Sequence, residues 1–120
     1  MIEGWFDEEG QLRFEIDLVT ADGLALPVDV LLDTGATEWL VINDQDLESL
    51  GWEFVGRRMV RTAQGETTLN VYGGKVILDR QEFEIPVVAT PAIEDYLFGL
   101  PWLRTRRLVA DFSAGVLTLG

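Results

Sequence analysis

The chain of 120 residues contains no cysteine and no histidine. The absence of cysteine excludes disulfide bonds, thiolate nucleophiles and cysteine-ligated zinc sites. The absence of histidine excludes Ser-His-Asp and Cys-His catalysis and the usual histidine-bearing metal sites. If the chain is an enzyme, its acid–base chemistry must therefore come from carboxylates, tyrosine, arginine or its single lysine, Lys75.

Basic residues are also scarce. Nine lysine and arginine residues stand against 21 aspartate and glutamate residues, so the net charge is −12 at pH 7. Phosphate backbones and anionic membrane surfaces repel such a chain, so we expect no nucleic acid and no membrane as partner. The basic cluster Arg104, Arg106 and Arg107 is expected to pair with the protein's own carboxylates. No Asp-rich calcium-loop pattern occurs, and we expect neither a metal nor another cofactor.

Long apolar runs are missing as well. No stretch approaches the roughly 20 residues of a membrane span, and no basic residue precedes an apolar run at the N-terminus. We therefore expect a cytoplasmic protein. With 48% hydrophobic residues and no linker or low-complexity segment, residues 1–120 are predicted to form a single domain with its own core.

Short apolar or alternating runs between turn residues predict a mostly β structure. Residues 12–18 alternate as in a strand with one dry face, and Asp22-Gly23 predicts a hairpin turn into a second strand, 24–32. We expect Gly73-Gly74 to mark a bulge or a close backbone approach, and short helices at 45–50 and 101–107. The expected fold is all-β, a small closed or partly closed barrel. Its further strands are predicted at 39–42, 55–62, 67–78, 83–85, 87–89, 108–112 and 116–119.

The most informative stretch is Asp33-Thr34-Gly35, which follows the mostly apolar run 28–32. Two carboxylates held about 3 Å apart cannot both stay ionised, so they share a proton. The ionised carboxylate can take a proton from a water molecule while the protonated one polarises a peptide carbonyl. This chemistry needs no metal, thiol or imidazole, which suits the composition. Asp, Thr and Gly are also ordinary turn residues, so the triplet alone does not specify catalysis.

The chain offers only one carboxylate in such a setting. Asp22-Gly23 lies in a polar turn, and Asp111-Phe112-Ser113 lacks the glycine at its third position. Half of a catalytic pair in each chain predicts a symmetric homodimer, in which both subunits supply Asp33 at the two-fold axis. We expect the monomer to be inert.

A second apolar pair closed by glycine, Leu97-Phe98-Gly99, follows further along the chain. A strand, Asp-Thr-Gly, a long hairpin and then this second motif occur in an order that resembles the retropepsin-like aspartic peptidases over residues 12–112. The resemblance implies an acid-protease barrel and an aspartic endopeptidase that activates water between paired Asp33 carboxylates. It implies that Asp33 is the catalytic aspartate, Thr34 the interlocking threonine and Gly35 the residue that completes the turn.

The same resemblance implies the contacts to a peptide substrate. The hairpin over residues 55–78 would be the flap that closes on the peptide, and Phe98 and Gly99 would support the Asp33 turn from beneath. Glu38 is suited to a basic side chain of the substrate. The substrate-binding residues implied in this way are Leu31, Ala36, Thr37, Glu38, Ala63, Gln64, Gly65 and Leu97.

Two positions depart from the retroviral members of this group. There, an aspartate is common two residues after the triplet and an arginine is common after the glycine of the second motif, and the two form a salt bridge that supports the dimer. Here these positions are Thr37 and Leu100. The dimer is therefore expected to close differently, with strands 109–119 as candidates. A non-catalytic dimerisation or peptide-binding module with the same fold stays open as the alternative.

Overall fold

A computed structural model describes residues 1–91 and 93–120, which are mostly β-strand. Three short helical segments accompany the strands: the 3₁₀ helix η1 (Asp44–Asp46), α1 (Leu47–Leu50) and the 3₁₀ helix η2 (Leu100–Arg104). The strands are β1 (Ile2–Glu3), β2 (Trp5–Phe6), β3 (Leu12–Val19), β4 (Ala25–Asp33), β5 (Leu40–Asn43), β6 (Glu53–Thr62), β7 (Gly65–Leu78), β8 (Gln81–Thr90), β9 (Tyr96–Gly99), β10 (Leu108–Asp111) and β11 (Val116–Leu119).

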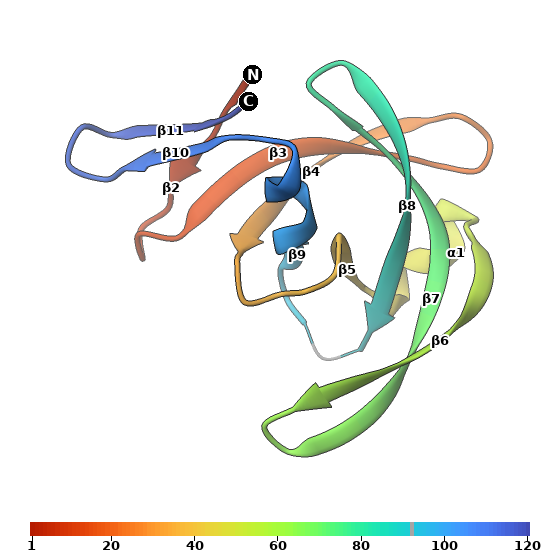
Figure 1. Cartoon of the computed structure of the whole chain (residues 1–120). Helices are drawn as coiled ribbons and strands as arrows, with labels where there is room; N and C mark the ends of the chain where they lie inside the picture. The colour runs from red at the N-terminus through yellow and green to blue at the C-terminus, as the bar shows by residue number, and fades with distance from the viewer. Residues whose placement is uncertain (92) are drawn as a thin grey trace.

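Six strands close into a ring, which confirms the expected partly closed barrel (Figure 1). Strands β3, β4, β9, β5, β8 and β7 pair in that order, and β3 also pairs with β7. Strand β9 lies between β4 and β5, parallel to β4 and antiparallel to β5. Strands β2 and β6 extend the sheet at its two ends. The ring therefore surrounds one core. The C-terminal ends of β4 and β9 lie side by side in it.

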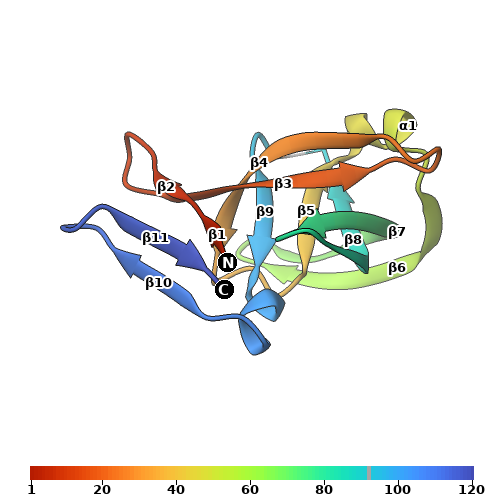
Figure 2. The ribbon, with the colours of Figure 1, turned by 90° about the horizontal axis from the view of Figure 1, so that it is seen from above.

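A smaller sheet, with strand order β1-β11-β10, projects from the ring. Figure 2 shows the β10–β11 hairpin reaching away from the ring beside β1 and β2. Strand β1 pairs with β11 of the same chain, with Ile2 opposite Leu119. The strands expected near 108–112 and 116–119 are confirmed, whereas the short strands β1 and β2 carried no predictive pattern.

The core forms because alternate residues of the strands point into the ring. In β3, Phe14, Ile16 and Leu18 are buried, and Phe14 lies opposite the buried Val30 of β4. Each such side chain contributes about 1.5–3 kcal/mol when it is fully buried. The turn between these strands contains Gly23 at φ +93°, a conformation that favours glycine. The alternation and the Asp-Gly turn were sufficient to predict this pair of strands.

The expected helix at 45–50 is confirmed as η1 followed by α1. Asn43 accepts a hydrogen bond from the Gln45 N–H at 2.9 Å, and Gly51 ends α1 at φ +69°. Among the described residues, no helix has both the length and the apolar character that a membrane crossing requires.

Two details of the sequence interpretation, the second helix and the division of a strand at Pro86, were wrong, and one pair of alternatives was decided. The helix expected over 101–107 is the 3₁₀ helix η2, which ends at Arg104. Of the two alternatives for Gly73-Gly74, the bulge does not occur there; the bulge of this hairpin lies in β6 between Phe54 and Gly56. Gly74 instead marks the close approach, since a Cβ there would lie 2.4 Å from a Val87 methyl group. Pro86 does not divide its strand, because β8 runs through it.

Candidate active site

The Asp33 carboxylate is held by its own turn at the end of β4. Its Oδ1 accepts a hydrogen bond from the Gly35 N–H at 2.9 Å, and its carbonyl oxygen accepts one from the Ala36 N–H at 3.1 Å. Asp33 is half-buried, while Thr34 and Gly35 are exposed. The carboxylate is therefore fixed in direction and remains accessible to a reacting molecule.

The second motif lies directly beside this turn. In the parallel pairing of β4 with β9, Leu31 aligns with Leu97, Leu32 with Phe98, and Asp33 with Gly99. Leu31 and Leu97 are both half-buried, and Phe98 is fully buried. The structure thus brings together the two motifs that are more than 60 residues apart in the sequence.

Backbone contacts clamp residues 36–39 against the start of η2. The Gly99 N–H donates to the Trp39 carbonyl at 3.1 Å, and the Leu100 N–H donates to the Ala36 carbonyl at 2.8 Å. A Cβ on Gly99 would lie only 1.7 Å from the Glu38 carbonyl oxygen. Only glycine fits at this position so close to the Glu38 carbonyl, which explains why the Leu97-Phe98-Gly99 motif ends in glycine.

Trp102 supports the clamp from the core. Its ring stacks on Phe98 with centroids 4.9 Å apart and an interplanar angle of 4°, and its indole N–H donates to the Trp39 carbonyl at 2.8 Å. Trp102 is 1% exposed. The sequence analysis did not single out Trp102. The signal that was available is the position of Trp102 three residues after the motif glycine.

The long hairpin is β6–β7, with Ala63 and Gln64 in a two-residue turn and Gly65 as the first residue of β7. It starts two residues earlier than expected and its tip is shorter, because residues 65 and 66 belong to the strand. All three tip residues are exposed. In Figure 1 the tip lies below the connection between β4 and β5, which carries the Asp33 turn.

One side chain pair joins this hairpin to the clamped loop. Glu38, the carboxylate implied as a contact for basic substrates, forms an ion pair and hydrogen bond with Arg58 of β6. Sequence reasoning missed Arg58, because Arg57 and Arg61 stand beside it and nothing in the pattern separates the three. Ala36 is half-buried and Thr37 is exposed, so both are accessible near the turn.

The positions that lack the retroviral salt bridge are both on the surface. Thr37 is exposed, and Leu100 has 43% of its surface exposed although its backbone N–H is bonded to Ala36. The basic cluster expected to pair with carboxylates does so in part: Arg106 lies 4.0 Å from Asp79 and 5.4 Å above the Phe83 ring.

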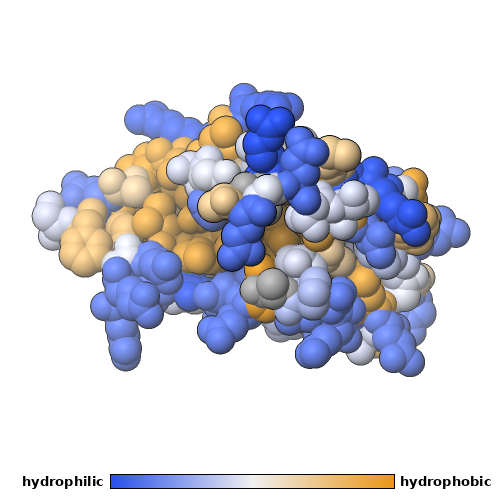
Figure 3. Space-filling view, turned by 90° about the horizontal axis from the view of Figure 1, so that it is seen from below, coloured by the Kyte–Doolittle hydropathy of each residue, from blue (hydrophilic) through white to orange (hydrophobic). Residues whose placement is uncertain are grey.

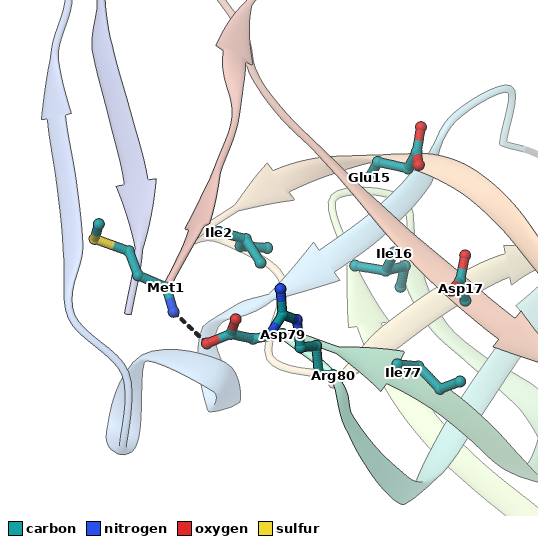
Figure 4. A pocket seen from close by; sticks show the side chains of 8 residues that line it. All are labelled: Met1, Ile2, Glu15, Ile16, Asp17, Ile77, Asp79 and Arg80. Carbon is teal, nitrogen blue, oxygen red and sulfur yellow. Dashed lines mark hydrogen bonds and ion pairs between the residues drawn. The ribbon is translucent and has the colours of Figure 1, made fainter.

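A cavity of about 540 Å³ lies elsewhere and contains none of the expected site residues (Figure 4). Its polar wall includes Asp79, whose carboxylate pairs with the Met1 ammonium group, and Arg80. The Met1 ammonium, through this hydrogen bond, lowers the pKa of Asp79. Among the described residues, no group of three or more acidic side chains is placed to hold a metal ion. The Asp33 turn is therefore the candidate site.

An apolar surface covers one end of the molecule. Figure 3, in which the molecule of Figure 1 is seen from below, shows this surface over the end at which Figure 1 places β2, β10 and β11. The large exposed apolar side chains of these elements and their turn are Trp5, Phe112 and Val116, of which Phe112 is 68% exposed. Such a patch on a chain of strongly negative charge is typical of an interaction surface.

Comparisons with known proteins agree with this geometry. The family model described as aspartyl protease matches residues 18–102. The crystal structure of a retropepsin-like aspartic protease from Rickettsia conorii superposes with a TM-score of 0.72 at 19% identity, covering 98% of this chain and 88% of that one. The solution structure of the Simian Foamy Virus (mac) protease superposes with a TM-score of 0.55 at 21% identity, covering 80% of this chain and 99% of that one. No curated protein matches the sequence. The expected retropepsin-like fold is confirmed.

Proposed function

The chain belongs to the aspartyl protease family, and from this premise we propose that it is an aspartic endopeptidase that acts as a homodimer. The observation that carries the proposal is the Asp33 turn, whose carboxylate is aimed by the Gly35 N–H and whose backbone is clamped by Gly99 and Leu100. A carboxylate held in this way loses little orientational freedom when it acts, which is what general acid–base catalysis requires.

The proposed mechanism needs two copies of this turn. Each subunit contributes one Asp33, and the pair shares a proton because two adjacent carboxylates cannot both ionise. The ionised member takes a proton from a water molecule, whose oxygen attacks the peptide carbonyl. The protonated member donates to the carbonyl oxygen. Thr34, exposed beside the turn, has a hydroxyl with which to bond the partner's turn.

The apolar end of the molecule supports the homodimer. The exposed side chains Trp5, Phe112 and Val116 belong to the end of the molecule that Figure 3 shows as a broad apolar area. The retroviral salt bridge is absent at Thr37 and Leu100, so burial of apolar surface has to supply the association energy. We propose that β10 and β11 contribute to this interface.

We propose that the substrate is a peptide bound in an extended form between the Asp33 turn and the β6–β7 hairpin. Leu31 and Leu97 would line the pocket beside the scissile bond, and Ala36 and Thr37 would meet the peptide backbone. Ala63, Gln64 and Gly65 at the hairpin tip would cover the peptide. The extended peptide would lie along the hairpin as an added strand lies along the edge of a sheet. No cofactor is required.

A subunit-mixing experiment tests catalysis and pairing together. Replacing Asp33 with Asn should lower the rate of cleavage of a peptide library at least about a hundredfold. The fold should persist, because the Asn side-chain oxygen can still accept from the Gly35 N–H. When wild-type protein is mixed with a ninefold excess of this variant, the rate per wild-type subunit should fall about tenfold, since most wild-type subunits then have an inactive partner.

Asp29→Asn is the matched control, because it removes the same charge from an exposed position of β4. The same excess of this variant should not reduce the rate. If the Asp33→Asn variant cleaves peptides at the wild-type rate, the assignment of Asp33 as the catalytic residue is refuted. If the mixture of wild-type and Asp33→Asn protein keeps its full activity, the site shared between two subunits is refuted. Peptide binding by wild-type protein without any product would favour the non-catalytic module.

A further inference from the structure

Glu38 is an unusual residue in this structure. Among the residues that the structure describes, Thr20 and Glu38 are the buried polar ones, and Glu38 is the one that carries a charge. Its side chain is 11% exposed. A carboxylate removed from water to this extent costs free energy unless a cation and hydrogen bonds compensate it. Arg58 of β6 supplies both.

The two partners of this ion pair belong to regions that are held very differently. The backbone of Glu38 is wedged against Gly99, where no side chain would fit. Arg58 lies on β6, which is the last strand in the sheet order and pairs there with β7. The ion pair thus ties a strand with one neighbour to the loop that carries the catalytic turn.

The alternation of side chains along β6 points Arg58 toward this loop. Val55 is an extra residue in the ladder, since Phe54 lies opposite Tyr72 and Gly56 opposite Val71. Beyond this bulge, Arg58 lies opposite Leu69, which packs with Val71 in an apolar cluster that also includes Leu97. Arg58 therefore projects from the face of the hairpin that looks toward the candidate site.

We propose that Glu38 and Arg58 form a latch that sets the position of the β6–β7 hairpin over the Asp33 turn. Arg58 is then a positioning residue, which acts through the hairpin and not on the reacting atoms. The latch rests on the proposed peptidase function and deepens it, because the hairpin it holds is the element that closes on the peptide. Glu38 is accordingly engaged by the protein itself before any basic side chain of a substrate reaches it.

The direct test is hydrogen exchange of the hairpin amides in the isolated protein. Arg58→Gln should speed exchange in β6 and β7 around residues 57–70 about three- to tenfold, the range expected when a partly exposed ion pair with a hydrogen bond is lost. Exchange in β3, β4 and β9 should stay unchanged. Arg58→Lys should restore most of the protection, because the positive charge remains.

The hairpin contains a matched control. Arg61 forms an ion pair with Glu66 across the same hairpin, at 3.3 Å, with side chains 83% and 53% exposed. Arg61→Gln removes the same charge from the same strand but breaks no contact to the loop, so hairpin exchange should change less than twofold. Equal exchange rates in Arg58→Gln and Arg61→Gln would overturn the latch. Faster exchange throughout the molecule in Arg58→Gln would also overturn it, because the pair would then be a general stabiliser.

Peptide kinetics add a second readout. Loss of the latch should raise KM several-fold while kcat changes less, since the hairpin grips the peptide but carries no reacting group. The exchange test does not depend on cleavage. If Asp33→Asn cleaves normally while Arg58→Gln loosens the hairpin, the latch stands and the peptidase assignment falls. If Asp33→Asn is inactive and Arg58→Gln leaves exchange in the hairpin unchanged, the peptidase assignment stands and the latch falls.

Discussion

The Asp33 turn and the β6–β7 hairpin are built by opposite means. The turn is clamped by backbone hydrogen bonds, by a glycine contact with no spare space and by the buried stack of Phe98 on Trp102. Among its described side chains, the hairpin beyond its pairing with β8 has exposed side chains on most positions, and its Arg58 is tied to Glu38 of the loop. The difference teaches that the direction of the Asp33 carboxylate is fixed by packing and backbone hydrogen bonds, whereas the Glu38–Arg58 pair ties the hairpin to the loop through polar side chains.

A pair of glycine substitutions should give the largest contrast between the two regions. Gly99→Ala places a methyl group 1.7 Å from the Glu38 carbonyl oxygen, so we expect a loss of about 3 kcal/mol or more of unfolding free energy. Gly73→Ala on the hairpin meets only a Val55 methyl group at 3.6 Å, and its effect should stay within about 1 kcal/mol. Urea unfolding measures both. A tolerated Gly99→Ala would contradict the clamp.

A pair of aromatic substitutions should give an intermediate contrast. Trp102 is buried among Phe98, Trp39 and Phe83, and Trp102→Ala should cost about 3–5 kcal/mol. Phe54 is 53% exposed and contacts the Tyr72 ring at 5.8 Å, so Phe54→Ala should cost about 1 kcal/mol. Thermal unfolding followed by circular dichroism compares the two, and equal losses would mean that the hairpin is part of the core.

The smallest effect is expected at Met59. This residue of β6 is 65% exposed and lies opposite Thr68, on the face of the hairpin away from Arg58. Met59→Ser should change the unfolding free energy by less than about 0.5 kcal/mol and leave KM for the peptide unchanged. An increase in KM like that of Arg58→Gln would show that the outer face of the hairpin also contacts the substrate.

Much of the local structure was predictable because its signals are local. The alternation of Phe14, Ile16 and Leu18 gave one strand, and the helix expected at 45–50 has its local caps in Asn43 and Gly51. The order of the motifs at Asp33 and Leu97 indicated the fold, and the structure aligns Asp33 with Gly99, while the catalytic role of Asp33 stays a prediction.

Contacts between distant residues were not predictable. Glu38 and Arg58 are 20 residues apart, and nothing in a single sequence says which of three nearby arginines faces a given carboxylate. The Gly73-Gly74 pair was a correct sign of crowding but not of its form, because Gly74 makes room for Val87 and the Trp52 ring. The bulge at Val55 is followed by Gly56 at φ +156°, so this lone glycine was the available sign of the irregularity.

The closure of the ring has a consequence for how the chain folds. In the ladder that joins β3 to β7, Asp17 pairs with Ile77 and Leu18 with Val76, and each pair spans about 60 residues of chain. The entropy of closing so long a loop opposes this pairing, which favours late formation of this seam. The meander β6–β7–β8, joined by tight turns, is free to assemble early. A nascent chain would therefore hold an open, curled sheet before the barrel seals.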